Sequence, residues 1–127
     1  MSVATGLNKR QQESEQVMRT LRFIIEGQVL TLDPTCDSSD LIPGTENFIR
    51  AHFSFSNEWD NCVKVAAFYS MIGSEYAPQQ IKEDMTCMIP IDATKRHRFK
   101  VQVIGRNKKE NSKLCTNKLI VEQGGGN

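Results

Sequence analysis

Apolar and polar positions alternate with a period of two along most of this chain. The clearest case is segment 48–55, where one set of alternate residues is apolar and the other set is polar: Ile49, Ala51, Phe53 and Phe55 against Arg50, His52 and Ser54. Alternation of this kind is typical of a strand with one buried face and one solvated face. The same pattern recurs in segments 21–26, 62–69, 85–89, 99–103 and 115–121.

Turn-forming residues separate these segments. Glycine, proline and asparagine fall in clusters at 26–28, 33–34, 42–44, 71–73, 89–90 and 104–107. Short alternating strands with regular turns predict an all-β fold, an immunoglobulin-like antiparallel β-sandwich of about seven strands. We expect Phe53 and Phe55 to face its core, Trp59 to fill one end of the sandwich, and Pro90 to end a strand.

The two ends of the chain differ from this central part. The predicted sandwich covers residues 21–123, between an N-terminal arm (1–20) and a glycine-rich tail (124–127). Asn8, followed three places later by Gln11, resembles a helix start, so the arm is expected to be helical or extended. Its apolar patch is limited to Val17, Met18 and Leu21, too little to hold it along the domain. We therefore expect the arm to attach the protein to a partner.

Length and composition fit one folded domain. The chain has 127 residues, of which 39% are hydrophobic and 24% are charged, enough for a single hydrophobic core. Its longest apolar runs fall far short of the roughly 20 residues that a transmembrane helix needs, so no membrane partner is expected. The N-terminal residues lack the apolar region of a secretory signal, which predicts synthesis in the cytoplasm.

Residues that could carry chemistry do not form a recognisable set. The four cysteines, Cys36, Cys62, Cys87 and Cys115, are 26, 25 and 28 residues apart and lack zinc-site spacing. We expect reduced thiols that fill core positions. His52 and His97 have no nucleophile or carboxylate beside them in the sequence. The acidic residues at 33, 37 and 40 match no calcium loop. The sequence predicts neither an enzyme nor a metal or cofactor site.

Charge is distributed unevenly along the chain. Nine basic residues and one acid between positions 95 and 118 give a formal charge of +8, whereas residues 23–92 carry −8. Phe99 is the only aromatic residue within the basic segment, and the alternation places it on the buried face of its strand. Nucleic acid is therefore not the favoured partner, because binding would need exposed aromatic residues among the cations. The alternatives are a solvated hairpin and a basic edge that meets acidic neighbours in an assembly.

Five short motifs in order resemble a family of tailed-bacteriophage structural domains. They are F-x-F-S-x-E-W-D at 53–60, K-x-A-x-F at 64–68, C-x-I-P at 87–90, F-x-V-x-V-x-G at 99–105 and T-N-x-x-x-V at 116–121. The resemblance covers about residues 21–123. It implies an immunoglobulin-like module of baseplate, tail-fibre or related virion proteins, often found at the N-terminus of a longer chain.

The resemblance implies a non-enzymatic virion protein that binds other virion proteins, as a homo-oligomer or as part of a symmetric assembly. Attachment to tail, baseplate or fibre is one alternative, and capsid decoration or a head fibre is another. A module that binds host-surface carbohydrate is the third, with Tyr76 and Phe48 as its candidate aromatic residues. The predicted partner-binding residues lie in the arm and the basic segment: Arg10, Val17, Met18, Arg19, Lys95, Arg96, Arg98, Lys108 and Lys109.

Overall fold

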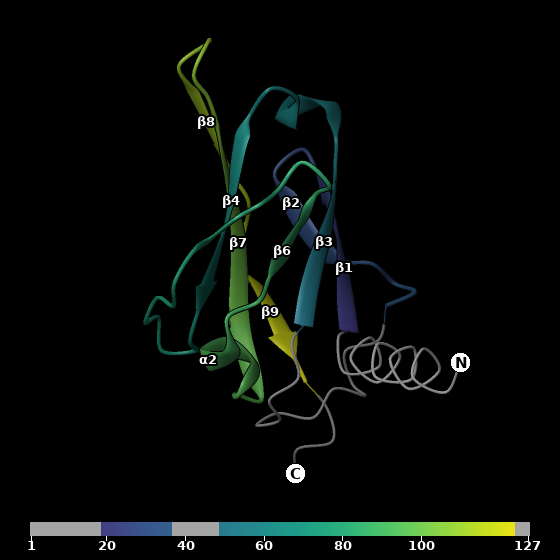
Figure 1. The fold of residues 1–127 in the computed structure, drawn as a ribbon, viewed down its shortest axis with the longest axis vertical. Helices are drawn as coiled ribbons and strands as arrows, with labels where there is room; N and C mark the ends of the chain where they lie inside the picture. The colour runs from purple at the N-terminus through teal and green to yellow at the C-terminus, as the bar shows by residue number, and fades with distance from the viewer. Residues whose placement is uncertain (1–18, 37–48, 124–127) are drawn as a thin grey trace, which may run out of the picture.

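Two β-sheets pack face to face in the computed structural model, which describes residues 19–36 and 49–123 (Figure 1). Sheet A has the strand order β2–β1–β3–β6, formed by β1 (Arg19–Glu26), β2 (Val29–Leu32), β3 (Ile49–Phe55) and β6 (Thr86–Met88). Sheet B has the order β5–β4–β7–β8, with β9 also paired to β7; its strands are β4 (Val63–Tyr69), β5 (Gln79–Gln80), β7 (Arg98–Asn107), β8 (Ser112–Cys115) and β9 (Leu119–Glu122). The predicted all-β sandwich is confirmed.

The strands differ from the expectation in their number, in the direction of one pair and in where the first strand begins. The described part of the chain contains nine strands rather than about seven, because β2 and β5 are too short to show an alternating pattern. Strands β1 and β3 pair in parallel, whereas every other pair is antiparallel. Strand β1 begins at Arg19, so Arg19 and Thr20 belong to sheet A rather than to the arm.

The turn expected at 104–107 is wrong, because β7 continues through these residues to Asn107. Gly105 faces the sandwich interior inside this strand, where it makes room for the Trp59 ring. The chain reverses after Asn107, whose side-chain oxygen accepts hydrogen bonds from the backbone N–H groups of Lys109 and Glu110. Asn111 then takes a left-handed conformation, φ 53°, before β8 begins.

The core lies between the sheets, where the alternating apolar residues meet. Phe23 and Phe53 stack with their ring centroids 5.1 Å apart, while Phe68 and Phe99 pack against each other in sheet B. Trp59 is completely buried in a 3₁₀ turn, Asn57–Trp59, that follows β3. Its indole N–H donates a 2.7 Å hydrogen bond to the carbonyl of Gly27. The predicted role of Trp59 as the residue that fills one end of the sandwich is confirmed.

Asn117 joins the two sheets across one side of the molecule. It lies between β8 and β9, where the predicted continuous strand 115–121 is interrupted. Its side-chain oxygen accepts from the N–H of Leu30 at 2.7 Å, and its amide nitrogen donates to the carbonyl of Leu30 at 3.2 Å. Thr116 holds this segment to β7, since its hydroxyl accepts from the N–H of Val103 at 2.9 Å. Strand β2 is therefore paired on its outer side by a side chain.

Replacement of Asn117 by alanine should lower the free energy of unfolding by about 1–3 kcal/mol, because the two polar groups of Leu30 lose their partner. Chemical denaturation with urea measures this change. The variant Asn117→Asp is the informative comparison, since a carboxylate can accept from the N–H but cannot donate to the carbonyl. We expect it to be destabilised as well; wild-type stability for both variants would contradict the role of Asn117.

Candidate protein-binding surface

The register of sheet B places five basic side chains on its outer face. Along β7, Phe99, Val101 and Val103 point into the core, so the residues that alternate with them point outward. Strands β8 and β9 pair with β7 in a register that extends this surface. We call it the basic face, and its cations are Arg98, Lys100, Arg106, Lys113 and Lys118.

Most of these cations form no ion pair with the residues that the structure describes. Arg98 forms a 2.6 Å ion pair with Glu122, but Lys100, Arg106, Lys113 and Lys118 form none with any residue that the structure describes. Lys113 lies directly opposite Arg106 in the antiparallel pair of β8 and β7. Like charges in this arrangement repel and reduce stability. A carboxylate from outside the chain would relieve this repulsion.

An aromatic ring and two exposed apolar side chains lie among the cations of the basic face. Tyr69 lies opposite Lys100, and the ammonium nitrogen of Lys118 is 4.3 Å from the centroid of its ring. Burial raises the pKa of the Tyr69 phenol, and the charge of Glu75 adds to this effect. The neutral hydroxyl donates to Gln102 at 3.3 Å. Val63 and Ile120, on β4 and β9, are 45% and 51% exposed. The face thus combines cations with an aromatic ring and two exposed apolar side chains.

A hollow of about 240 Å³ continues this face at one end of the sandwich. It is lined by Ser70, Met71 and Ile72, from the loop after β4, and by Arg96 and Arg98, from the segment before and at the start of β7. Ile72 is 92% exposed, the highest value among the large hydrophobic residues described. We call this feature the end hollow. It combines two aliphatic side chains with two guanidinium groups.

The structure separates the basic residues that the sequence grouped together. Arg98 belongs to the basic face and Arg96 to the end hollow, while Lys95 follows the short helix α2 (Ile91–Thr94) and lies 4.0 Å from Asp92. Lys108 and Lys109 lie in the turn between β7 and β8, at the opposite end of the ten-residue strand β7 (Figure 1). At about 3.3 Å per residue, these two groups are about 30 Å apart.

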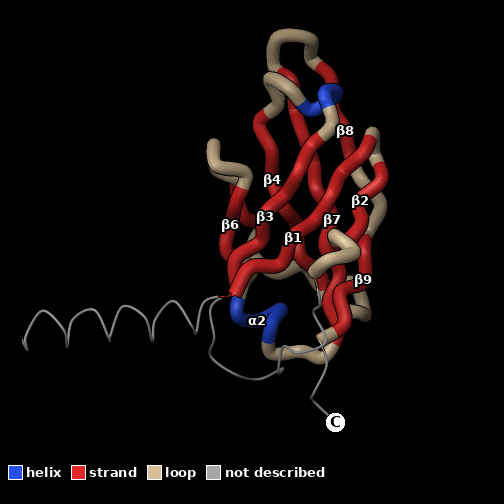
Figure 2. The backbone as a smooth tube through the Cα atoms, turned by 90° about the vertical axis from the view of Figure 1, so that its right-hand side faces the viewer, coloured by secondary structure: helices blue, strands red, loops and turns tan. Residues whose placement is uncertain are grey.

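The remaining predicted partner-binding residues fall elsewhere. Arg10, Val17 and Met18 lie outside the described residues. Arg19 is exposed at the start of β1, on the other sheet (Figure 2). The other four cations of the basic face, Lys100, Arg106, Lys113 and Lys118, belong to the basic segment 95–118 but were not named among the predicted partner-binding residues. Arg98, Lys100 and Arg106 occupy alternate positions of one strand, so the sequence could have placed them on one face. The positions of Lys113 and Lys118 beside them depend on how the neighbouring segments pair with that strand.

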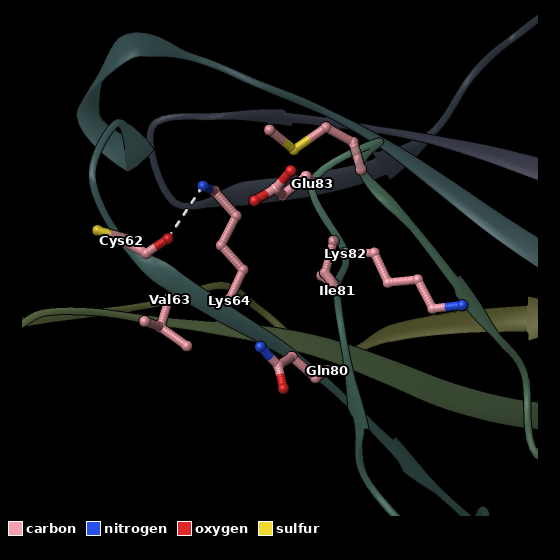
Figure 3. Close-up of a pocket in the computed structure, with 8 residues that line it drawn as sticks. Cys62, Val63, Lys64, Gln80, Ile81, Lys82 and Glu83 are labelled. Atoms are coloured by element: carbon pink, nitrogen blue, oxygen red, sulfur yellow. Dashed lines mark hydrogen bonds between the residues drawn. The ribbon is translucent and has the colours of Figure 1, made fainter.

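A second concavity, of about 310 Å³, lies beside β4 and β5 (Figure 3). Its lining residues are Cys62, Val63, Lys64, Gln80, Ile81, Lys82, Glu83 and Met85. The ammonium group of Lys64 donates to the carbonyl of Cys62 at 3.1 Å and lies 5.1 Å from the centroid of the Phe55 ring. Lys64, which belongs to one of the five motifs, is thus engaged with its own fold.

The histidines lie apart from each other. His52 is half-buried on the outer face of sheet A, while the imidazole of His97 is 3.7 Å from the carboxylate of Glu122. Across residues 19–36 and 49–123, no three or more His, Cys, Asp or Glu side chains are grouped so that they could hold a metal ion. The same ranges contain no helix that is long and apolar enough to cross a membrane.

The four cysteines are free thiols, and Cys87 is the one that is fully buried. Burial raises the pKa of the Cys87 thiol from 9.0 to about 12, an effect that Lys82 partly offsets. This cysteine fills the core as predicted, whereas the other three are half-buried.

Cys87 should resist alkylation by iodoacetamide in the folded protein and react once the protein is unfolded, because its thiolate is disfavoured and enclosed. Since the folded pKa lies above the unfolded value, the folded state retains a proton that the unfolded state has lost. The free energy of unfolding should therefore fall as pH rises from about 9 towards 12. The variant Cys87→Ala is the control, and an equal loss of stability in both proteins would contradict this assignment.

Comparison with known proteins adds no relative: no family model, curated protein or solved structure matches this chain. The class that the structure defines is thus an all-β sandwich with a basic outer face on one sheet.

Proposed function

We propose that this chain is a non-enzymatic structural protein of a tailed-bacteriophage virion, which binds acidic surfaces of neighbouring virion proteins through its basic face. The observation that carries the proposal is a set of four cations on one sheet face that form no ion pair with any described residue, with Arg106 and Lys113 directly opposite each other. A partner that supplies carboxylates here would gain attraction and also remove repulsion.

The virion part of the proposal comes from the resemblance of the five motifs to virion modules, and the structure shows what the motif residues do in the fold. Phe53, Trp59 and Phe68 are buried in the core, Gly105 lies against the Trp59 ring, and Asn117 joins the sheets. Cys87 and Ile89, from the motif at 87–90, are buried in the same core. Each of the five motifs therefore includes residues that specify this sandwich, and the resemblance to virion modules concerns the fold itself. The outward-facing residues of the described strands are not part of this core, and we expect them to meet partners, including other copies of the chain in a symmetric assembly.

The carbohydrate-binding alternative gains no support from the described residues. Among them no aromatic side chain is an exposed large hydrophobic residue, and Tyr76 packs partly buried against the core. Phe48 lies outside the described residues. Tail attachment and capsid decoration use the same surface and differ in copy number.

Mass spectrometry of purified particles from cells that produce the protein tests the proposal. We expect the chain in stoichiometric amounts, with a few to tens of copies per particle indicating the tail and hundreds indicating the capsid. Particles that lack the chain after purification would contradict the proposal.

Charge reversal on the basic face should prevent assembly. We expect Lys100→Glu combined with Lys113→Glu to lower incorporation into particles at least tenfold. Lys82→Glu is the control, since it makes the same kind of charge reversal at an exposed residue of the other concavity. Incorporation of wild-type protein should also weaken as salt rises, because charges are screened beyond about 8 Å at physiological ionic strength. Incorporation that is independent of both salt and charge reversal would rule out the basic face.

A further inference from the structure

We infer that the end hollow is an anchor site for a partner protein segment that carries an apolar side chain next to a carboxylate. The inference rests on the proposed function and names the chemistry of the contact. It comes from three observations. The turn 70–74 forms one wall of the hollow, the segment that Gln123 holds forms the other wall, and Arg96 and Arg98 give the hollow its charge.

The first wall is a turn that holds Met71 and Ile72 in place. The N–H of Ser70 donates to the carbonyl of Ser74 at 2.8 Å, and the N–H of Gly73 donates to the carbonyl of Ser70 at 3.0 Å. The hydroxyl oxygen of Ser70 also accepts from the N–H of Ser74 at 3.0 Å. Gly73 has φ +98°, a conformation that favours glycine. A fixed turn thus presents aliphatic side chains to solvent, where they have no role in the core.

The second wall is the segment that carries Arg96, and Gln123 fixes it. The buried amide of Gln123 donates to the carbonyl of Thr94 at 2.8 Å and to that of Arg96 at 2.5 Å. The backbone N–H of Gln123 donates to the carbonyl of His97 at 2.7 Å. Three residues of the segment, Thr94, Arg96 and His97, are therefore tied to the residue that follows β9. Because both walls are preorganised, a ligand would lose little affinity to ordering of the site.

The guanidinium groups of Arg96 and Arg98 indicate which charged group the ligand carries. Arg98 is paired with Glu122, whereas Arg96 forms no ion pair with any described residue. A guanidinium group binds a carboxylate through two parallel hydrogen bonds. The hollow of about 240 Å³ beside it admits a leucine or phenylalanine side chain against Met71 and Ile72. Its hydrophobic lining is aliphatic, which favours an apolar side chain over a stacked nucleic-acid base.

Two variants and one control test the site in assembled particles. Ile72→Ser removes the apolar wall, and Arg96→Glu replaces the cation by an anion. The control is Val29→Ser combined with Lys82→Glu, which makes the same two kinds of change at exposed positions outside the hollow. Thermal melting of each purified variant should match the wild type, because all four side chains are exposed.

We expect each site variant to reduce incorporation into particles at least tenfold, while the control assembles normally. Normal incorporation of Ile72→Ser and Arg96→Glu would overturn the inference and leave the proposed function intact. Absence of the wild-type chain from particles would instead overturn the proposed function, and the inference with it.

A photo-crosslinking amino acid at position 72 identifies the occupant in particles that contain the protein. The expected product is a crosslink to a segment of another virion protein in which an apolar residue adjoins Asp or Glu. A crosslink to a second copy of this chain, to nucleic acid, or to a segment without carboxylates would overturn the inference.

Discussion

Trp59→Ala should destabilise the fold by about 3–5 kcal/mol, the cost of removing a large buried aromatic side chain and leaving a cavity. The indole is completely buried and packs against Phe55, with ring centroids 5.4 Å apart. Its N–H also donates to the carbonyl of Gly27. Because folded domains are stable by only about 5–15 kcal/mol, this loss is a large fraction of the total.

Urea denaturation followed by circular dichroism measures this effect without relying on tryptophan fluorescence. Trp59→Phe is the matched variant, since it keeps a ring in the cavity and removes the hydrogen bond to Gly27. We expect it to lose less than half as much stability as Trp59→Ala. An unchanged unfolding midpoint for Trp59→Ala would mean that the indole is not a core residue.

Gly105→Ala should cost at least about 1–3 kcal/mol, the usual range for an overpacked core. A Cβ atom at this position would lie 2.6 Å from Cζ3 and 2.7 Å from Cε3 of the Trp59 ring. The ring is enclosed on all sides, so it has no free space into which to move. The same denaturation experiment gives the change in the free energy of unfolding.

A double-mutant cycle separates this clash from any intrinsic preference for glycine in the strand. In the Trp59→Ala protein, the ring is absent and a methyl group at position 105 fills part of the cavity. Gly105→Ala should then be neutral or stabilising, which gives a coupling energy of opposite sign to the single-variant losses. A Gly105→Ala penalty that is the same in both proteins would contradict the contact with Trp59.

The hydrophobic pattern correctly predicted the strands in which apolar and polar residues alternate clearly. It did not predict which strands pair or that one pair is parallel. Residues 49–55 and 99–103 show the expected alternation because each strand has one dry face. The glycine at position 105 suggested a turn, although its small size is required by a ring 46 positions earlier in the chain. Such a requirement is tertiary, and local composition cannot distinguish it from a turn. The parallel pairing of β1 with β3 likewise depends on contacts between distant segments.

The binding surface was predicted in charge but not in geometry. The sequence identified a basic segment, and the structure divides it among the basic face, the end hollow and the β7–β8 turn. Lys113 joins Arg106 only because the hairpin register brings them opposite each other. Ile72 appeared in the sequence as part of a turn, and its exposure follows from the hydrogen bonds that close that turn.

The amide of Asn117 also affects how the protein behaves at high concentration. Strand β2 is an outer strand of sheet A, and a bare outer strand can recruit a strand from another molecule and start aggregation. Here the N–H and carbonyl of Leu30 are already bonded to a side chain from the opposite sheet. On sheet B, the Lys64 ammonium similarly occupies the carbonyl of Cys62, beyond the end of the short strand β5. Crowded copies of this chain are thereby hindered from joining by strand addition at these positions and would meet through side chains instead.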